Sequence, residues 1–416
     1  MQTKMFIGGE WCDAAKGARH AVINPATEET VAEVAYGDAG DAKRAVEAAA
    51  KAMPAWMKLT AYDRAKVLKR TADLMRERAE AIARTLTTEQ GKPVAEAKAE
   101  VLHSADTFEW FAEEGKRAYG QVIPNSAPGK RHLTLKHPVG VVAAISPWNF
   151  PITLQARKIA PALAAGCTIV CRPASQTPLC LIQVFECLKE AGLPPGVANL
   201  VIGPGAEMAD EFMRNSAVRK ISFTGSTEVG KGLMRAAADG MKRLSLELGG
   251  HAPFIVFPDA DPEMGAKIAV TGKFRNNGQV CIAPSRFYVH KDVQKKFTEA
   301  AVGFAQALKM GNGLEAGVEV GPMFEKKALA TTQALVDDAR GAGARILTGG
   351  KRSDRFDKGY FFEPTVLSGV PDAAKMMTEE PFAPVMPIVD FSDIDAVIAA
   401  ANNTRYGLAA YVFTND

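Results

Sequence analysis

The pattern of apolar and polar residues divides the chain into a helical first part and a longer α/β part. Between Asp41 and Tyr119, apolar residues recur three and four positions apart with charges between them, as in RAKVLKRTADLMRERAEAIARTL. This spacing predicts amphipathic helices. The stretch GQVIPNSAPGK then breaks the pattern, and RHLTLKHPVG alternates like an exposed strand. We therefore expect a protruding hairpin over residues 119–138.

Beyond the hairpin, short apolar runs alternate with helical stretches. The runs VGVVAAI, CTIVC, ANLVIG and KISF are separated by segments such as PITLQARKIAPALAAG and PLCLIQVFECLKEAG. Strands that are apolar on both faces and joined by helices predict a doubly wound parallel sheet with right-handed crossovers. Such a sheet binds its ligands at the carboxyl ends of its strands.

A second α/β unit begins near Leu248, with APFIVF as its first strand and helices from Glu263 and Asp292. The predicted fold class is therefore α/β, with two domains and a hairpin. The expected ranges are a Rossmann-like doubly wound domain over 1–118 and 139–247, the hairpin over 119–138, and a second α/β domain over 248–416.

Composition and charge exclude several classes of protein. The chain has 416 residues, of which 47% are hydrophobic and 23% charged, so a disordered or fibrous protein is not expected. Fifty basic and 47 acidic residues give a net charge of +3, which provides no field for nucleic acid or a membrane surface. The six cysteines form no C-x-x-C pair and the N-terminus MQTKMFIGGEW has no signal-peptide run. We expect a cytoplasmic protein with no metal.

Two glycines mark a turn that could bind phosphate. Gly225 and Gly230 stand five apart in FTGSTEVGK, directly after the run KISF. Glycines between a strand and a helix let the backbone approach a diphosphate, and the helix N-terminus favours an anion. The segment matches neither the G-x-G-x-x-G fingerprint nor a Walker A loop. An ordinary strand-helix turn is therefore the alternative.

Three single residues are candidates for chemistry. Cys281 follows the polar segment NNGQ, where partial exposure and local amides favour a thiolate; the alternative is an inert small hydrophobe. Glu247, between two leucines, is either a solvated strand end or a partly desolvated carboxylate suited to act as a general base. Asn149 either caps the helix that starts at Pro151 or donates its amide to a developing oxyanion.

Together these segments resemble the aldehyde dehydrogenase family. The matching motifs are PWNFP at 147–151, FTGSTEVG at 223–230, ELGG at 247–250, GQVC at 278–281 and EEPFAPV at 379–385. The resemblance extends over essentially the whole chain, from IGGEW to YGLAAYVFTND. It implies that the first domain binds a dinucleotide, that the hairpin serves oligomerisation and that the second domain is catalytic.

The resemblance also implies a mechanism. Cys281 would be the nucleophile that adds to an aldehyde carbonyl, and the Asn149 amide and the Cys281 backbone N–H would hold the oxyanion. After hydride transfer leaves a thioester, Glu247 would activate the water that hydrolyses it. Lys158 matches a lysine that helps to relay protons in relatives.

The implied cofactor is NAD(P)+. The family's cofactor-binding positions fall on Trp148, Gly205, Gly225, Ser226 and Leu248, with Glu380 and Phe382 near the nicotinamide ribose. Arg172 stands where relatives usually have Lys, and Ser175 where strictly NAD-dependent members tend to have Glu. Loss of that carboxylate leaves room for a 2′-phosphate, which Arg172 is able to bind bidentately. We therefore expect NADP+ to be accepted alongside NAD+.

Within the family, the chain is most similar to the succinate semialdehyde dehydrogenase branch, through EWFAEEGKRAYG, ELGGHAPFIV and KFRNNGQVC. Arg157 and Arg275 match the positions from which that branch holds the substrate's distal carboxylate; the alternative is two solvated arginines. A carboxylate in a partly apolar tunnel needs a fixed cation. We expect oxidation of succinate semialdehyde to succinate, while 2-oxoglutarate semialdehyde and glutarate semialdehyde stay open.

Members of the family continue for several dozen residues beyond the position of Asp416. The resemblance therefore predicts a C-terminally truncated, incomplete catalytic domain, in which the hairpin strand near RHLTLKH lacks its expected partner in a neighbouring subunit. A homodimer or homotetramer is expected if that tail is present. The alternative to an active dehydrogenase is an inactive remnant that binds only the dinucleotide.

Overall fold

The computed structural model describes all 416 residues and divides them into two compact units. The first unit comprises Met1–Ile23, Thr30–Glu89 and Ala97–Glu247, and the second comprises Asn24–Glu29, Gln90–Glu96 and Leu248–Asp416. The main division thus lies between Glu247 and Leu248. The predicted first domain took in all of 1–118 and is wrong over two short segments, because Asn24–Glu29 and Gln90–Glu96 pack in the second unit. No helix combines the length and the apolar character needed to cross a membrane.

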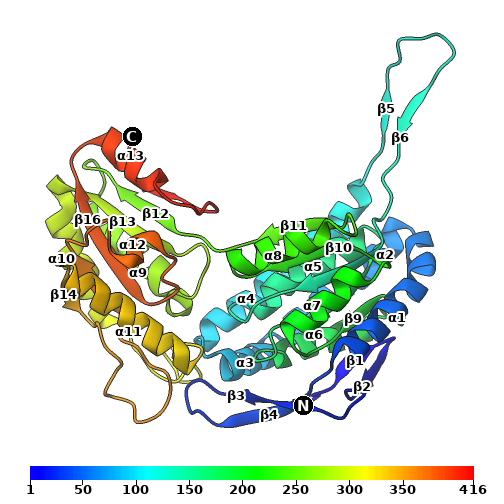
Figure 1. Ribbon diagram of the computed structural model, residues 1–416, viewed down its shortest axis with the longest axis horizontal. Coiled ribbons are helices and arrows are strands. Elements are labelled where there is room, and N and C mark those ends of the chain that lie inside the picture. Colours follow the sequence, from blue (N-terminus) through cyan, green and yellow to red (C-terminus); the bar gives the residue numbers. More distant parts are fainter. The chain divides into compact units, whose positions relative to one another are not determined.

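The first unit is built on a seven-stranded sheet (Figure 1). Its strands are β1 (Met5–Ile7), β2 (Glu10–Cys12), β7 (Val141–Ile145), β8 (Thr168–Arg172), β9 (Ala198–Leu200), β10 (Val218–Thr224) and β11 (Arg243–Glu247). The order is β11-β10-β7-β8-β9-β1-β2, with the five strands β7 to β11 parallel and β1 and β2 antiparallel at one edge. All residues of β7 are buried, as the uninterrupted apolar run predicts.

Helices cover both faces of this sheet. They are α1 (Ala39–Lys58), α2 (Ala61–Glu77), α3 (Ala79–Gln90), α4 (Val94–Glu114), α5 (Pro151–Ala164), α6 (Leu179–Glu190), α7 (Gly205–Arg214) and α8 (Thr227–Ala237), with a 3-10 turn at Gly115–Arg117. Helix α1 packs on β7, β8 and β9 and contacts α7, whereas α5 packs on β7 and β8 beside α2 and α6. The predicted doubly wound architecture is confirmed.

Two small hairpins accompany the main sheet. Strands β3 (Arg19–Ile23) and β4 (Thr30–Ala35) pair antiparallel, and so do β5 (Gln121–Ile123) and β6 (His132–Thr134). The β5-β6 hairpin extends away from the rest of its unit (Figure 1). Its apolar side chains are exposed, with Val122 at 80% and Leu133 at 65%. The structure therefore shows a projecting hairpin within the predicted range 119–138.

A buried carboxylate replaces the missing N-cap of α5. The N-cap position is Phe150, which makes no side-chain cap, and Pro151 begins the helix. Glu100 of α4 accepts hydrogen bonds from the backbone N–H groups of Ile152 at 3.0 Å and Thr153 at 3.2 Å. A carboxylate is favoured there because the helix dipole is positive at its N-terminus. The alternative role of Asn149 as the N-cap is therefore wrong.

Helix α6 has the same arrangement. Its N-cap position, Pro178, makes no side-chain cap, and Glu89 of α3 accepts from the N–H groups of Leu179 and Cys180, both at 2.8 Å. Burial raises the pKa of Glu89 to about 7, and these hydrogen bonds oppose the rise. The helical lead-in thus fixes the start of two sheet-covering helices.

The second unit contains a six-stranded sheet. Its strands are β12 (Ala252–Val256), β13 (Pro284–His290), β14 (Arg345–Thr348), β15 (Thr365–Ser368), β16 (Val385–Phe391) and β17 (Tyr411–Phe413). The order is β14-β15-β16-β13-β12-β17, and only β14 is antiparallel. The predicted second α/β unit is confirmed.

Alternate residues of the central strands face two separate cores. The helices are α9 (Pro262–Phe274), α10 (Lys291–Ala307), α11 (Lys326–Gly341), α12 (Lys375–Thr378) and α13 (Ile394–Asn402), with a 3-10 turn at Arg275–Gly278. Phe287 and Val289 of β13 join the core with α9 and α10, whereas Tyr288 joins the core with α11 and α12. This alternation follows from the two-residue period of a strand.

Candidate functional site

The strand order of the first unit creates a crevice between β7 and β10. The chain proceeds from β7 to β8 and β9 on one side and then returns to β10 on the other. At such a switch point the connections leave in opposite directions, and ligands bind at the carboxyl ends of the strands. A pocket of about 560 Å³ lies there, lined by residues that end both strands, including Ile145, Ser146, Phe223 and Thr224.

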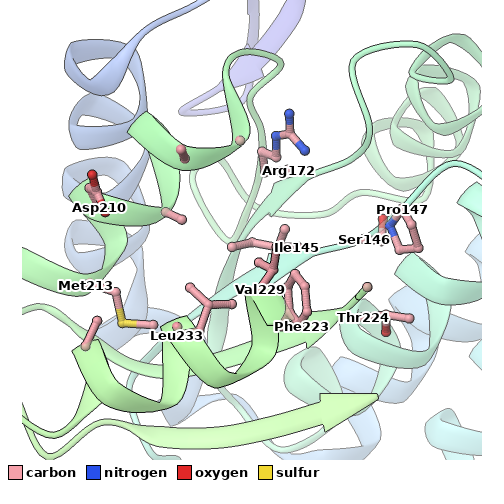
Figure 2. Close-up of a pocket in the computed structure, with 16 residues that line it drawn as sticks. Ile145, Ser146, Pro147, Arg172, Asp210, Met213, Phe223, Thr224, Val229 and Leu233 are labelled. Carbon is pink, nitrogen blue, oxygen red and sulfur yellow. The ribbon is translucent and has the colours of Figure 1, made fainter. Parts of the chain in front are cut away.

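Helices α7 and α8 complete this pocket. Figure 2 shows Met213 and Leu233 beside Ile145 and Phe223, and Arg172 on another part of the wall. The lining is therefore apolar in the middle with a cation at its border. This distribution suits a ligand that has a flat apolar part and an anionic part.

The turn from β10 to α8 lies at this pocket. Gly225 lines the pocket and its N–H donates to the Glu247 carbonyl at 3.0 Å. Ser226 is the N-cap of α8 and accepts from the Val229 N–H at 3.4 Å. Ser226 was predicted to bind the cofactor and is not among the lining residues. A helix N-terminus here favours a phosphate.

Arg172 and Ser175 form a polar cluster over the Gly203 carbonyl. Arg172 donates to that oxygen at 2.6 Å, and Ser175 donates to it at 3.1 Å. The two side chains also contact each other at 3.3 Å. Arg172 and Gly205 both line the pocket. The predicted pair therefore lies together at the edge of the crevice.

Lys158 lies at the carboxyl ends of β10 and β11. It is buried, and its Nζ donates to Thr224 Oγ1 at 2.7 Å. Burial lowers the pKa of Lys158 to about 8, and the carboxylate of Glu247 opposes this shift. Thr224 pairs with Glu247 in the parallel register of β10 and β11. The structure thus brings Lys158, Thr224 and Glu247 together.

The environments of Asn149 and Glu247 differ. Asn149 is 3% exposed, beyond the end of β7 and before α5, and its neighbour Trp148 is half-buried. The Glu247 side chain is exposed at the end of β11. The idea that the adjacent leucines desolvate this carboxylate is therefore wrong. Arg157 is exposed on α5.

In the second unit, Cys281 lies three residues before the start of β13 at Pro284 and is half-buried. It follows three consecutive residues with left-handed backbone, namely Asn276, Asn277 and Gly278, with φ of 46°, 58° and 73°. Non-glycine residues seldom adopt this conformation, although Asn is the most tolerant of them. At Gly278 a Cβ would overlap the carbonyl oxygen of Ala383, so a side chain is excluded. The segment before the thiol is therefore tightly determined.

The ELGG segment packs directly on the backbone of Cys281. A Cβ at Gly250 would overlap the carbonyl oxygen of Cys281. The Gly250 N–H donates to Glu380 Oε1 at 3.2 Å. Burial raises the pKa of Glu380 and lowers that of the fully buried Lys273, and the attraction between the two charges opposes both shifts. Glu380 was predicted to contact a ribose; here it supports the Gly250 backbone.

Tyr411 links the remaining predicted residues of this unit. Its hydroxyl donates to the carbonyl of Ile282 at 2.7 Å. Burial raises the pKa of Tyr411, the Arg275 guanidinium opposes the rise, and the Cys281 thiolate adds to it, so both groups lie near the phenol. Leu248 and Phe382 are half-buried, and Phe382 has φ of 40°. Cys281 and the exposed Arg275 thus belong to one neighbourhood.

Several residues of these clusters gave no signal in the sequence. Glu100 lies in no motif, and the quoted segments that contain Thr224, Lys273 and Tyr411 did not single out these residues. Glu100 meets α5 only because the fold joins segments 52 positions apart. Thr224 was identifiable in principle, since it stands between the predicted strand KISF and Gly225.

Comparisons with known proteins agree with this arrangement. Residues 11–416 match the model of the aldehyde dehydrogenase family. The chain is 48% identical to a glutarate-semialdehyde dehydrogenase of Pseudomonas putida and 47% identical to an NADP(+) succinate-semialdehyde dehydrogenase of Escherichia coli, covering 99% of this chain and 85% of each relative. The crystal structure of a succinate-semialdehyde dehydrogenase from Burkholderia pseudomallei matches with a TM-score of 0.98 at 44% identity, covering 100% of this chain and 86% of that one.

The contact between Gly250 and Cys281 gives a test that needs no substrate. Replacing Gly250 by Ala forces the Cys281 backbone to move, and overpacking of this kind costs roughly 1–3 kcal/mol in the free energy of unfolding. Gly407 pairs with Gly250 in a β-bridge but has open space at its Cβ position. Urea unfolding should therefore show a lower free energy of unfolding for Gly250→Ala. For Gly407→Ala the free energy of unfolding should stay within about 0.5 kcal/mol of the wild-type value. Equal effects of the two variants would contradict the described packing.

Proposed function

Because the chain belongs to the aldehyde dehydrogenase family, we propose that it oxidises a short, carboxylate-bearing semialdehyde with NAD(P)+ through a thioester on Cys281. Family membership confirms the predicted enzyme class and the use of a nicotinamide dinucleotide. The observation that carries the substrate proposal is that Arg275 begins the turn leading to Cys281, whose neighbour Ile282 accepts a hydrogen bond from Tyr411. It provides a nucleophile for an aldehyde and a cation for a carboxylate.

The thiolate of Cys281 adds to the aldehyde carbonyl carbon, and the carbonyl oxygen becomes an oxyanion. The Asn149 amide and the Cys281 backbone N–H donate hydrogen bonds to that oxygen. A bound nicotinamide dinucleotide would supply the acceptor for the hydride. Loss of hydride from the adduct leaves a thioester on the sulfur. Glu247 then takes a proton from the water that attacks this thioester, which releases the carboxylic acid and restores the thiolate.

The exposure of Glu247 and the burial of Lys158 support this division of roles. An exposed carboxylate has access to water, which a base for hydrolysis requires. Lys158 is buried beside Thr224 with a pKa of about 8, so it is able to exchange a proton near neutral pH. We assign Lys158 to proton relay from Glu247 and not to direct attack on the substrate.

The pocket of the first unit fits a dinucleotide. Its apolar walls from β7, β10 and α8 suit an adenine ring, and the N-terminus of α8, which follows Gly225 and begins at Thr227, suits a diphosphate. Arg172 and Ser175 at its edge suit the 2′-phosphate of NADP+. By the family resemblance, Trp148, Gly205, Ser226 and Leu248 also contact the cofactor, with Glu380 and Phe382 near the nicotinamide ribose.

Arg275, with Arg157 as a second cation, is assigned to the substrate's distal carboxylate. Succinate semialdehyde is the first choice, and it agrees with the succinate-semialdehyde dehydrogenases among the relatives. Glutarate semialdehyde and 2-oxoglutarate semialdehyde are the alternatives, and the Pseudomonas putida relative is named for the first of these.

The exposed apolar residues of the β5-β6 hairpin support the proposal of a homodimer or homotetramer. Val122, Leu133 and Leu135 are between 65% and 80% exposed, and both edges of this two-stranded sheet offer unpaired backbone groups. All six cysteines are free, which agrees with a reducing compartment such as the cytoplasm.

Removal of the Arg275 cation should affect a carboxylate-bearing substrate more than a neutral one. Arg275→Ala should raise KM for succinate semialdehyde about ten- to hundredfold, because a charge-assisted hydrogen bond is worth roughly 1.5–3 kcal/mol, and should change KM for butanal less than threefold. Steady-state assays of NADPH formation provide the measurement. Arg345→Ala, at an exposed arginine of β14, is the matched control. Equal effects of Arg275→Ala on both aldehydes would contradict the assignment of Arg275 to the substrate's distal carboxylate.

The Arg172 and Ser175 cluster predicts the dinucleotide preference. The wild-type kcat/KM with NADP+ should lie within a few hundredfold of that with NAD+. Arg172→Ala should lower kcat/KM for NADP+ about tenfold or more while leaving NAD+ within about threefold, because only the 2′-phosphate loses its partner. Ser175→Glu should act in the same direction through repulsion. If either variant weakens the use of both dinucleotides equally, the 2′-phosphate does not bind at this cluster.

A further inference from the structure

The left-handed turn before Cys281 is held by hydrogen bonds from two sources. Within the segment, Gln279 donates to the Asn276 carbonyl from both its backbone N–H and its Nε2, each at 3.0 Å. Gln279 Oε1 in turn accepts from the Phe324 N–H at 2.9 Å, and Asn277 Nδ2 donates to the Gly321 carbonyl at 3.1 Å. All of these bonds are buried, so the turn is part of the core of its unit.

The second source is the segment Gln90–Glu96, which we call the strap. Glu96 Oε2 accepts from the Asn276 N–H at 2.9 Å, and Gln90 Nε2 donates to Asn276 Oδ1 at 3.0 Å. Gln90 is fully buried and Asn276 is 1% exposed. Two strap residues therefore fix both the backbone and the side chain of the first left-handed residue.

The strap is itself anchored in the second unit. The Val94 N–H donates to the Gly313 carbonyl at 2.9 Å, and the Lys92 N–H donates to Gln90 Oε1 at 3.0 Å. The Gln90 amide is thus oriented from both ends, because its oxygen accepts from the strap and its nitrogen donates to Asn276. The fixed Gln90 side chain therefore constrains the position of Asn276 in the turn.

We propose that Gln90 and Glu96 are positioning residues for Cys281. They act through Asn276: they hold it in the left-handed region and thereby set the position of the Cys281 sulfur and backbone N–H five residues later. The inference rests on the proposed function for the chemical role of Cys281. Left-handed backbone at a non-glycine residue persists only where the surroundings determine it, and the strap is part of those surroundings.

Removal of a strap bond lets Asn276 relax toward a right-handed conformation. The Cys281 sulfur and the local amides that favour its thiolate then lose their arrangement. A displacement of about 1 Å at a reacting group is enough to cost up to about a hundredfold in rate. The pocket of the first unit contains no strap residue, so binding of the dinucleotide should not change.

The test is the alkylation of Cys281 by iodoacetamide as a function of pH, followed by peptide mass spectrometry to separate Cys281 from the half-exposed Cys12. Glu96→Ala and Gln90→Leu should slow Cys281 alkylation at pH 7 about tenfold and move its pH profile upward. Glu96→Gln keeps an acceptor oxygen and should recover much of the wild-type rate. Glu80→Gln, at an exposed glutamate of α3, should leave the profile unchanged.

In steady-state assays, Glu96→Ala should lower kcat by a similar factor while KM for NADP+ stays within about twofold. An unchanged alkylation profile in both Glu96→Ala and Gln90→Leu overturns the proposal. Alkylation of the buried Cys171 would reveal unfolding of Glu96→Ala. In that case Gln90→Leu and Glu96→Gln provide the test, and alkylation profiles equal to that of the wild type in both variants overturn the proposal. If the wild-type protein oxidises no semialdehyde, the proposed function is contradicted. The alkylation profiles of the variants still test the positioning role of Gln90 and Glu96 in that case.

Discussion

The position of the Cys281 sulfur depends on three consecutive residues in the left-handed region. Asn276, Asn277 and Gly278 turn the chain against its ordinary preference, and buried hydrogen bonds to Asn276 offset the cost. Gly250 packs against the carbonyl of Cys281, where a single methyl group would not fit. The thiol is therefore placed by backbone constraints on both sides, as a reaction that needs an aligned attack requires.

In the first unit, buried carboxylates stabilise the N-termini of two helices. Two helices, α5 and α6, begin without a side-chain cap of their own, and the carboxylates of Glu100 and Glu89 satisfy their free N–H groups from inside the core. Because Glu100 does this for α5, the residues around its start are not needed as caps. The positive N-terminus of α8, which follows Gly225 and begins at Thr227, by contrast adjoins the pocket that we assign to the dinucleotide.

Much of this could be predicted from the sequence, because it depends on local patterns. The apolar runs predicted β7, β8, β10 and β12, and the helical spacing of apolar residues predicted α2 and α5. The Pro- and Gly-containing stretch after Tyr119 predicted the hairpin. The motifs gave the family, which the comparisons confirm. What could not be predicted depends on distant pairs: Glu100 capping α5, Tyr411 reaching Ile282, and the strap reaching Asn276. The same reason explains two errors, since neither the packing of Gln90–Glu96 nor the exposure of Glu247 follows from neighbours in the sequence.

The central claim is that the substrate becomes covalently attached to Cys281 and that Glu247 serves the step that releases it. Rapid-quench mass spectrometry of the Cys281 peptide, after mixing the protein with succinate semialdehyde and NADP+, tests this most directly. The account predicts a succinyl adduct on this peptide that is transient in the wild type, accumulates in Glu247→Gln and is absent from Cys281→Ser. NADPH formation without any adduct on the Cys281 peptide, or continued turnover by Cys281→Ser, would contradict it.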